Sequence, residues 1–294
     1  MRNLSFEVRP GVVTGFLGPN GAGKSTTMRL MLRLVRGSGS TTFGGRQIHQ
    51  LRHPSRTVGA MLDPTAHHPG RTAWAHIHML AAAAGASNRR VDEVIDLVGL
   101  SDVARQRSGE FSLGMQQRLA LAAALVGDPE YLILDEPANG LDPQGIRWLR
   151  DFLTSLTAQG RTVLLSSHQL AEMAQTADEV IVLGRGQIIT QGRLGDFVER
   201  FTHRYVVMRS PHLQHLAECL RANHIGPVEP HGPDGLVVTG RAGLEELGEL
   251  AAHYGITLHE LSSHTSSLED AFLEATAADS VFTAGAGRSH PEIP

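Results

Sequence analysis

Residues 18–26 bring glycines, a lysine and two hydroxyl side chains together at a spacing suited to holding phosphate. The stretch reads Gly18, Pro19, Asn20, Gly21, Ala22, Gly23, Lys24, Ser25 and Thr26. Glycines let successive backbone N–H groups curl around an anion with no Cβ in the way. Lys24 can reach the β- and γ-phosphates of a nucleotide, and the Ser25 hydroxyl can ligate Mg²⁺. The complete spacing favours a nucleoside triphosphate site over a glycine-rich turn that binds nothing.

Two adjacent carboxylates, Asp135 and Glu136, follow the apolar run 131–134, which predicts a strand buried on both faces. In open α/β sheets, ligands bind at the carboxyl ends of the strands. We therefore expect Asp135 to hold Mg²⁺, directly or through water, and Glu136 to accept a proton from an attacking water molecule. The alternative is a strand that ends in two solvated acids, which the phosphate loop upstream disfavours.

His168 stands directly after the next expected strand, 162–166. At that place it could donate to a γ-phosphate or fix the attacking water. Taken alone, it is more typical of an ordinary histidine at the end of a strand. The sequence leaves both interpretations open.

These groups need a scaffold of alternating strands and helices. The apolar run 12–17 predicts the strand before the phosphate loop, and the run 27–36 predicts the helix after it. Residues 3–8 alternate apolar and polar as a half-buried strand does, and residues from 72 to about 100 have helical spacing. Strands and helices alternate in this way through residue 189, which predicts an α/β fold with a mainly parallel sheet.

Composition divides the chain into three parts. Residues 1–200 hold the phosphate loop and the strand-end carboxylates, and residues 201–280 have the pattern of a small α+β module. The last stretch, 281–294, contains Gly, Arg, Ser, His and Pro and is expected to be a disordered tail.

Bulk composition excludes several classes of function. The 294 residues carry a net charge of −4 at pH 7, which gives no reason to expect a nucleic-acid partner. No run of about 18 uninterrupted apolar residues occurs, so no segment is expected to cross a bilayer and work at a membrane would need another subunit. The single cysteine, Cys219, rules out an internal disulfide and fits a reducing cytoplasm.

Five motifs, taken in order, resemble those of one protein family. They are the phosphate loop, Phe111-Ser112-Leu113-Gly114-Met115-Gln116-Gln117-Arg118, Tyr131 to Pro137, Gly140-Leu141-Asp142-Pro143, and Ser167-His168. The second motif stands where the ATP-binding subunits of ABC transporters have their signature, which generic phosphate-loop NTPases lack. Residues 1–200 thus resemble such a subunit, an ABC-type ATPase domain with a P-loop NTPase core and a helical signature subdomain at about 64–125. The module 201–280 resembles an appendage of the drug-export branch.

The resemblance implies a sandwich dimer, either a homodimer or a pair with another ATPase subunit, that buries two ATP molecules. Each ATP would lie between the phosphate loop of one subunit and Ser112 and Gly114 of the other, and Asp142 would also contact nucleotide. Ser112 suits this role because a helix start presents its hydroxyl and its N–H groups to an anion. Hydrolysis would let the halves part, and a separate transmembrane permease would use that motion. The protein would then be cytoplasmic and peripheral on the inner face of the cell membrane.

Three departures from the family pattern bear on the expected site. Asp63 stands where the family usually has a glutamine, and it is expected either to ligate Mg²⁺ through water or only to turn the chain before Pro64. Leu113 and Met115 replace glycine and glutamine in the signature. The family has an earlier strand and an aromatic residue that stacks on adenine, so the start looks truncated. A chain extended upstream is therefore predicted to bind ATP more tightly, by roughly 1–3 kcal/mol.

The activity implied by the resemblance is ATP hydrolysis that powers an exporter. Drug or antibiotic efflux is the main expectation, and lipid or polysaccharide export is the alternative. A soluble ABC-type ATPase of translation or DNA repair is a rival, disfavoured because the chain has one cassette and no heptad insert. A regulatory protein that binds ATP without hydrolysing it is disfavoured by the presence of Glu136 and His168.

Overall fold

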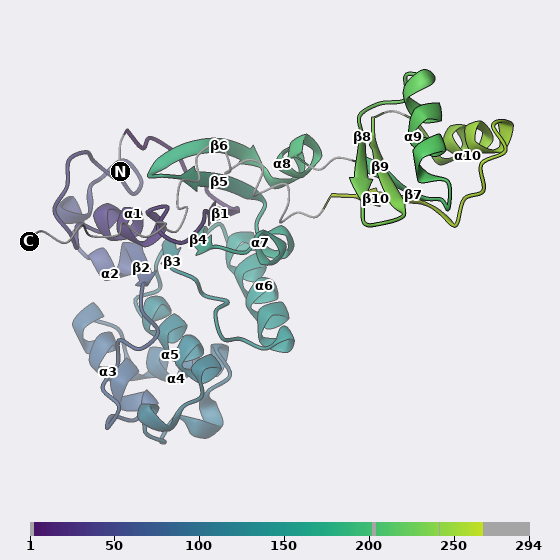
Figure 1. The fold of residues 1–294 in the computed structure, drawn as a ribbon. Helices are drawn as coiled ribbons and strands as arrows, with labels where there is room; N and C mark the ends of the chain where they lie inside the picture. The colour runs from purple at the N-terminus through teal and green to yellow at the C-terminus, as the bar shows by residue number, and fades with distance from the viewer. Residues whose placement is uncertain (1–2, 202–203, 241, 267–294) are drawn as a thin grey trace, which may run out of the picture. The chain divides into compact units, whose positions relative to one another are not determined.

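A computed structural model gives the fold of residues 3–201, 204–240 and 242–266 (Figure 1). The chain divides into two compact units, one reaching from the start of the chain to Gly195 and the other running from Asp196 to Ala275. The predicted tail 281–294 lies outside the described residues, as does the predicted module beyond residue 266. No helix in the described ranges is long and apolar enough to cross a membrane.

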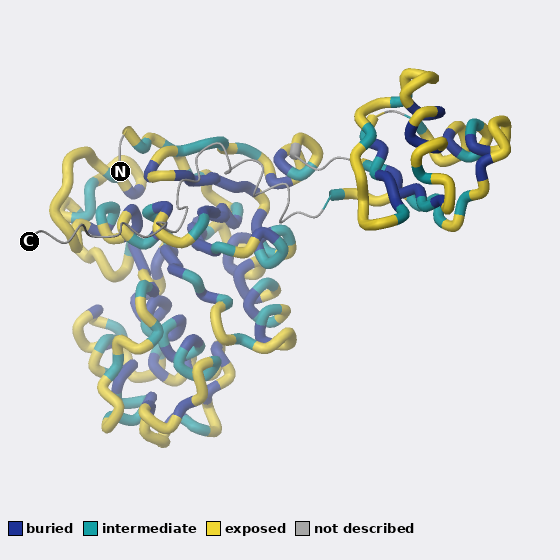
Figure 2. The backbone as a smooth tube through the Cα atoms, viewed as in Figure 1, coloured by how far each residue is buried: buried dark blue, intermediate teal, exposed yellow. Residues whose placement is uncertain are grey.

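A six-stranded sheet with the order β2-β3-β4-β1-β5-β6 forms the centre of the first unit. Its strands are β1 (Val13–Leu17), β2 (Val58–Met61), β3 (Tyr131–Leu134), β4 (Thr162–Ser167), β5 (Glu179–Gly184) and β6 (Gln187–Arg193). All neighbouring strands pair in parallel except β6, which pairs antiparallel with β5. Every residue of β1, β4 and β5 is buried, as their apolar sequences require (Figure 2). The predicted α/β fold with a mainly parallel sheet is confirmed.

Helices connect the strands of this sheet. In the first unit they are α1 (Lys24–Met31), α2 (Pro54–Thr57), α3 (Ala73–Ala84), α4 (Asn88–Leu97), α5 (Leu113–Leu125), α6 (Pro143–Ala158) and α7 (Leu170–Thr176), and α8 (Leu194–Phe201) follows β6. Helices α3, α4 and α5 pack against one another and form a helical lobe at the bottom of the view in Figure 1. Helix α5 also packs on β2, which joins this lobe to the sheet.

The helical structure expected from 72 to about 100 is confirmed. It consists of two helices, because Gly85 adopts a left-handed conformation with φ 66° at the end of α3 and Ser87 caps α4. The strand expected at residues 3–8 differs from the structure. Residues 3–8 form no strand, because their backbone pairs with no described strand. Their apolar side chains are partly buried against the core, and the ring of Phe6 lies 5.4 Å from that of Phe16. The alternating pattern therefore reports which face is buried rather than a hydrogen-bonded strand.

The second unit has an antiparallel four-stranded sheet and two helices. Its strands, in the order β10-β7-β9-β8, are β7 (Arg204–Arg209), β8 (Val228–His231), β9 (Gly235–Thr239) and β10 (Glu260–Thr265), and its helices are α9 (Leu213–Ala222) and α10 (Leu244–His253). Alternate residues of β7 and β9 join one face of each helix in a core, among them Met208, Leu216, Leu220, Leu236 and Leu247. This core is separate from that of the first unit.

Candidate nucleotide-binding site

The phosphate loop joins β1, in the interior of the sheet, to α1. Gly21 and Gly23 adopt left-handed conformations, with φ of 82° and 105°, which only glycine adopts readily. A Cβ on Gly18 would lie 2.8 Å from the carbonyl oxygen of Leu183, so the loop packs closely against β5. Helix α1 begins at Lys24, three residues before the predicted start, because Gly23 already ends the loop. The first N–H groups of α1, which have no partner within the helix, therefore lie at the loop and can donate to an anion bound there.

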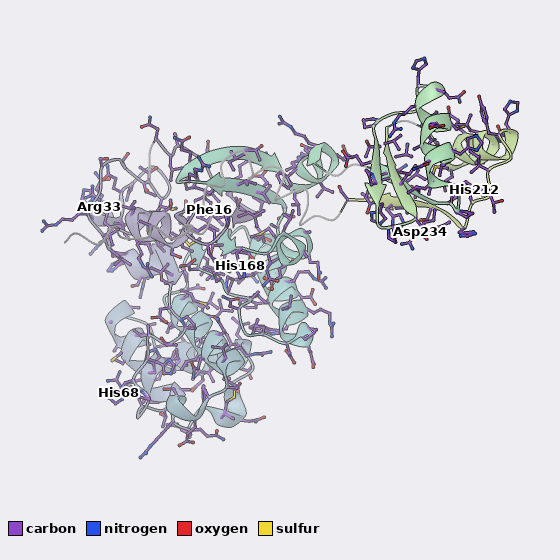
Figure 3. The ribbon with its side chains drawn as sticks, in the orientation of Figure 1. Phe16, Arg33, His68, His168, His212 and Asp234 are labelled. Atoms are coloured by element: carbon purple, nitrogen blue, oxygen red, sulfur yellow. The ribbon has the colours of Figure 1, made fainter. Side chains whose placement is uncertain are left out.

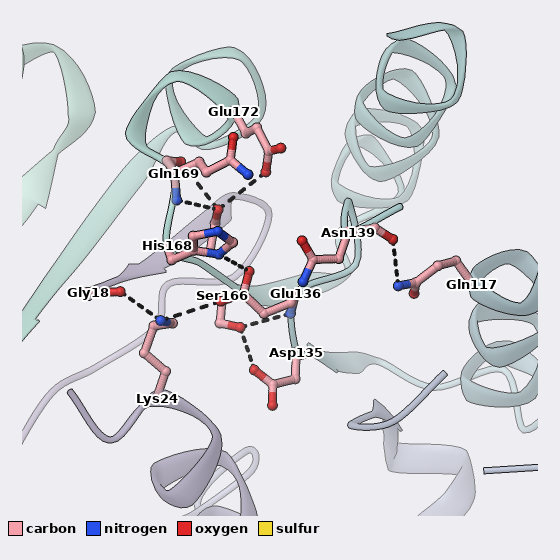
Figure 4. A network of polar contacts seen from close by, with 11 residues as sticks. Gly18, Lys24, Gln117, Asp135, Glu136, Asn139, Ser166, His168, Gln169 and Glu172 are labelled. Carbon is pink, nitrogen blue, oxygen red and sulfur yellow. Dashed lines mark hydrogen bonds and ion pairs between the residues drawn. The ribbon is translucent and has the colours of Figure 1, made fainter. Parts of the chain in front are cut away.

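Lys24 folds back over this loop. Its side chain is only 6 % exposed, and Nζ donates to the carbonyl oxygen of Gly18 at 2.7 Å. Nζ also lies 3.4 Å from Oε1 of Glu136, which comes from the end of β3 (Figure 4). The structure thus joins the lysine of the first motif to a carboxylate more than a hundred residues later in the sequence.

Asp135 and Glu136 are organised by a serine of the neighbouring strand β4. The hydroxyl of Ser166 donates to Oδ1 of Asp135 at 2.6 Å and accepts from the backbone N–H of Glu136 at 2.9 Å. Ser166 is fully buried, and Asp135 is nearly so. Sequence reasoning missed Ser166, although a polar pair, Ser166-Ser167, at the end of an otherwise apolar strand was a usable signal.

Glu136 has a backbone φ of 50°, in the left-handed region that non-glycine residues rarely adopt. Such strain persists where the surroundings hold a residue in place, and it is common at functional sites. Here the Ser166 hydroxyl holds its N–H, and Nδ1 of His168 lies 2.9 Å from Oε2 of its carboxylate (Figure 4). His168 is therefore a direct neighbour of Glu136. Lys24 lies beside the other oxygen of the Glu136 carboxylate.

Oxygen donors at this edge suit a hard divalent cation. Asp135 is 7 % exposed, and its Oδ2 has no hydrogen-bond partner within the described residues. The Ser25 hydroxyl stands at the second position of α1, one residue after Lys24. A buried carboxylate and a hydroxyl of this kind are ligands that Mg²⁺ accepts, with water completing its shell.

The carboxylate of Asp63 accepts hydrogen bonds from a residue of its own loop. Its Oδ1 accepts hydrogen bonds from the backbone N–H of Thr65 at 2.8 Å and from the Thr65 hydroxyl at 2.7 Å. These two hydrogen bonds lower the pKa of Asp63 below its ordinary value, because they favour the carboxylate. The turn-forming role left open by the sequence is visible in these bonds, and its Mg²⁺ role stays a prediction.

Ser112, Gly114 and Asp142 form a second group. Ser112 caps α5 by accepting from the N–H of Met115 at 3.3 Å, and Asp142 caps α6 by accepting from the N–H of Gly145 at 2.7 Å. In the described part of the chain, no hydrogen bond or ion pair joins this group to residues 18–26. The group is instead joined to the loop after Glu136, as the next contacts show.

Helix α5 holds the loop 136–142 from one side. Gln117 is 4 % exposed, and its Nε2 donates to the carbonyl oxygen of Asn139 at 2.8 Å (Figure 4). The side chain of Leu113 packs so closely on Gly140 that a Cβ there would lie 2.1 Å from Cδ2 of the leucine. The signature helix and the segment that follows the catalytic candidate Glu136 are thus one packed structure.

Comparisons with known proteins agree with this geometry. A family profile described as "ABC transporter" matches residues 1–139, and a second, described as a domain of unknown function, matches residues 204–269. The ABC transporter ATP-binding protein YhcH of Bacillus subtilis, itself uncharacterised, is 36 % identical over 280 residues, covering 93 % of this chain and 90 % of its own length. The chain belongs to the ABC transporter ATP-binding family.

Relatives of this ABC ATPase include proteins named for antibiotic transport. The bacitracin transport ATP-binding protein BcrA of Bacillus licheniformis is 33 % identical over 280 residues, covering 92 % of this chain and 90 % of its own. The lantibiotic transport ATP-binding protein SrtF of Streptococcus pyogenes is 36 % identical over 192 residues, covering 65 % of this chain and 83 % of its own. Among solved structures, an ATP-binding subunit of an ABC transporter matches with a TM-score of 0.60 and 28 % identity, covering 67 % of this chain and 84 % of that one.

Membership of this family confirms the prediction of an ABC-type ATPase, a subunit that binds and hydrolyses ATP for transport. A dimeric ATP-binding cassette bound to ADP and Pi has the same fold, with a TM-score of 0.59 at 22 % identity, covering 64 % of this chain and 88 % of that one. Within this ABC ATPase, the structure brings Lys24, Asp135, Glu136 and His168 to one edge of the sheet. The signature residues lie on the adjoining helical lobe.

Proposed function

We propose that this ABC ATPase powers the export of peptide antibiotics or related drugs. It works as a dimer on the cytoplasmic face of a membrane, together with a separate permease subunit. The bacitracin transport relative supports this choice because its alignment spans 92 % of the chain, so the resemblance extends beyond the ATPase unit. A second relative, named for lantibiotic transport, supports the same class of cargo.

The catalytic part of the proposal rests on the two contacts of the Glu136 carboxylate. One of its oxygens lies beside Lys24 and the other beside His168 (Figure 4). When ATP occupies the loop, its phosphates compete with Glu136 for the ammonium of Lys24. Oε1 of Glu136 is then free to accept a proton from the water whose oxygen bonds to the γ-phosphorus, while the bond from that phosphorus to ADP breaks. His168 holds Oε2 and so keeps the carboxylate aimed.

Ser25 and Asp135 would hold Mg²⁺ in this scheme. The ion supplies positive charge against the phosphate oxygens as negative charge shifts to the leaving ADP. Ser166 would position both acidic residues without contacting nucleotide, because its hydroxyl donates to the carboxylate of Asp135 and accepts from the backbone N–H of Glu136.

The dimer part of the proposal rests on the start of α5. Ser112 and Leu113 are exposed there, and Leu113 shows 49 % of its surface to solvent. The 13-residue helix directs its N-terminal N–H groups outward, where they can meet the γ-phosphate of ATP held by a second copy. Each ATP would then be held by both subunits, and its hydrolysis would weaken their association.

The test is a resistance and pull-down experiment in cells that express this chain together with a candidate permease, which is a multi-span membrane protein. We expect the two proteins to co-purify, and the pair to raise the bacitracin concentration that stops growth. The pair carrying Glu136→Gln should co-purify without raising it. Failure to co-purify would overturn the permease assignment. Co-purification with unchanged resistance to bacitracin and lantibiotics would overturn the antibiotic cargo and leave lipid or polysaccharide export.

A further inference from the structure

Charge is distributed unevenly along the first unit. Residues 8–62 contain eight Lys or Arg residues and no Asp or Glu, whereas the whole chain carries a net charge of −4. Three of these cations are engaged inside the fold: Arg9 and Lys24 form ion pairs with Glu179 and Glu136, and Arg56 donates to backbone carbonyls. The net charge therefore conceals a local excess of positive charge.

The other five cations form what we call the basic surface. Its members are Arg29, Arg33, Arg36, Arg46 and Arg52. All five are exposed, and none forms an ion pair with another residue of the described chain, although the charge of Arg29 helps to lower the pKa of the nearby Asp63. One guanidinium nitrogen of Arg33 lies 3.1 Å from Nδ1 of His49, so the end of α1 lies beside the segment 46–52. The basic surface is thus brought together from two separate segments of the chain.

Two aliphatic side chains are exposed within the basic surface. Leu34 shows 64 % and Val35 shows 41 % of its surface to solvent, and both stand between Arg33 and Arg36. Arg33 adopts a left-handed backbone with φ 56°, which ends α1 and turns these residues away from the helix axis. Figure 3 shows Arg33 at the margin of the first unit, and Figure 2 shows the exposed tube beyond α1.

We propose that the basic surface binds the anionic phospholipid surface of a membrane, independently of any permease. Arginines flanking exposed aliphatic side chains suit a bilayer interface, where guanidinium groups meet phosphates and the aliphatic groups enter the acyl boundary. A nucleic-acid partner fits less well, because the aromatic residues of the stretch 8–62, Phe16 and Phe43, are both buried and offer no stacking platform. The contact would hold the ATPase at the membrane whether or not a permease is bound.

The strength of this contact follows from its charges. Each arginine near an anionic surface multiplies partitioning by about five-fold at moderate salt, and two exposed aliphatic side chains add to it. Removing Arg33 and Arg36 together should therefore weaken partitioning by about 25-fold. The effect is electrostatic, so it should also vanish at about 1 M salt, where the Debye length is about 3 Å.

The test is co-sedimentation of the purified full chain with vesicles. One set is pure phosphatidylcholine, and the other contains about one third phosphatidylglycerol, which supplies the negative surface potential. We expect binding to the anionic set alone, lost at high salt, lowered about 25-fold by Arg33→Gln with Arg36→Gln, and lowered less by Leu34→Ser with Val35→Ser. The matched control changes two exposed arginines elsewhere, Arg89→Gln with Arg147→Gln, and should bind as the unchanged chain does.

Several outcomes would overturn the proposal. They are equal binding to both vesicle sets, no binding to either, or an equal loss in the control pair. Binding of a DNA duplex that competes with the vesicles and is lost in the same variants, without binding to the anionic set, would assign the surface to nucleic acid instead. ATP turnover in solution, which should be unchanged in all variants, shows that they fold. Because the vesicles contain no permease, this result is independent of the transport assignment.

Discussion

Glu136 and Lys24 form an ion pair with 3.4 Å between Oε1 and Nζ, although Lys24 belongs to the first of the five motifs and Glu136 to the third. Both side chains are largely buried, and each has one further partner: the carbonyl of Gly18 for the lysine and His168 for the carboxylate. The pair gives each of these two charges an opposite charge as its partner. In the proposed mechanism, nucleotide binding would therefore also free Glu136 to act as general base, because the phosphates would take the lysine from the carboxylate.

Replacing the carboxylate separates binding from hydrolysis. Glu136→Gln keeps the shape of the side chain but removes its ability to accept a proton, so we expect phosphate release to fall by about 10²–10⁴-fold while ATP still binds. Turnover and ATP affinity are measured side by side. Glu172→Gln is the matched control and should leave turnover nearly unchanged, since among the described residues the Glu172 carboxylate accepts only from the hydroxyl of Ser167. Retained turnover in Glu136→Gln would falsify the role assigned to Glu136.

Ser166→Ala tests the serine that joins the two carboxylates. The change leaves the N–H of Glu136 and Oδ1 of Asp135 without their partner in a fully buried place, which we expect to cost about 1–3 kcal/mol in the free energy of unfolding. Turnover should fall with it, because the strained backbone of Glu136 loses its anchor. Urea unfolding and phosphate release are the measurements. Ser155→Ala, which removes a helix hydroxyl from α6, should change stability by no more than about 0.5 kcal/mol, and an equal effect of the two changes would contradict the argument.

Much of the site was predictable because it is encoded in short local patterns. The left-handed glycines at 21 and 23, the buried strand before Asp135 and the cap at Ser112 each depend on neighbours in sequence. What could not be predicted depends on partners far along the chain. Ser166 matters only because β4 pairs with β3. Residues 3–8 lie near β6, where the Gln191 side chain donates to the carbonyl of Glu7, but their backbone joins no ladder with a described strand. The same holds for Asp63, since its pattern fits both a ligand and a turn until the bonds from Thr65 are seen.

Gln117 is predicted to position the loop after Glu136 rather than to bind nucleotide. Gln117→Leu removes the donor to the Asn139 carbonyl and should lower kcat several-fold with little change in KM, because the loop carrying the general base is loosened while the phosphate loop is intact. Steady-state kinetics gives both constants. The neighbouring Gln116 donates to Phe111 instead, so Gln116→Leu is a matched control that should keep kcat. A change in KM alone would show that Gln117 acts on nucleotide binding.

The buried side chain of His76 is expected to make the folded state less stable in mild acid. It lies on α3, is 6 % exposed, and its Nδ1 has no hydrogen-bond partner among the described residues. Burial lowers the pKa of His76 below its ordinary value of 6.5, and the nearby His67 and Arg71 lower it further. The unfolded chain therefore takes up a proton at a higher pH than the folded chain does. Stability should be complete above pH 6.5 and should fall as the pH drops from there toward the lowered pKa.

The measurement is urea unfolding at a series of pH values from about 7.5 to 5.5, spanning the ordinary pKa of histidine. His76→Gln cannot take up this proton, so its free energy of unfolding should fall less steeply over the same range, even if its stability at the top of the range is lower. His78→Gln is the matched control on the same helix, where the ring stacks on Trp74 instead of being enclosed, and it should keep the slope of the unchanged chain. Equal slopes in His76→Gln and the unchanged chain would show that the acid sensitivity comes from other groups.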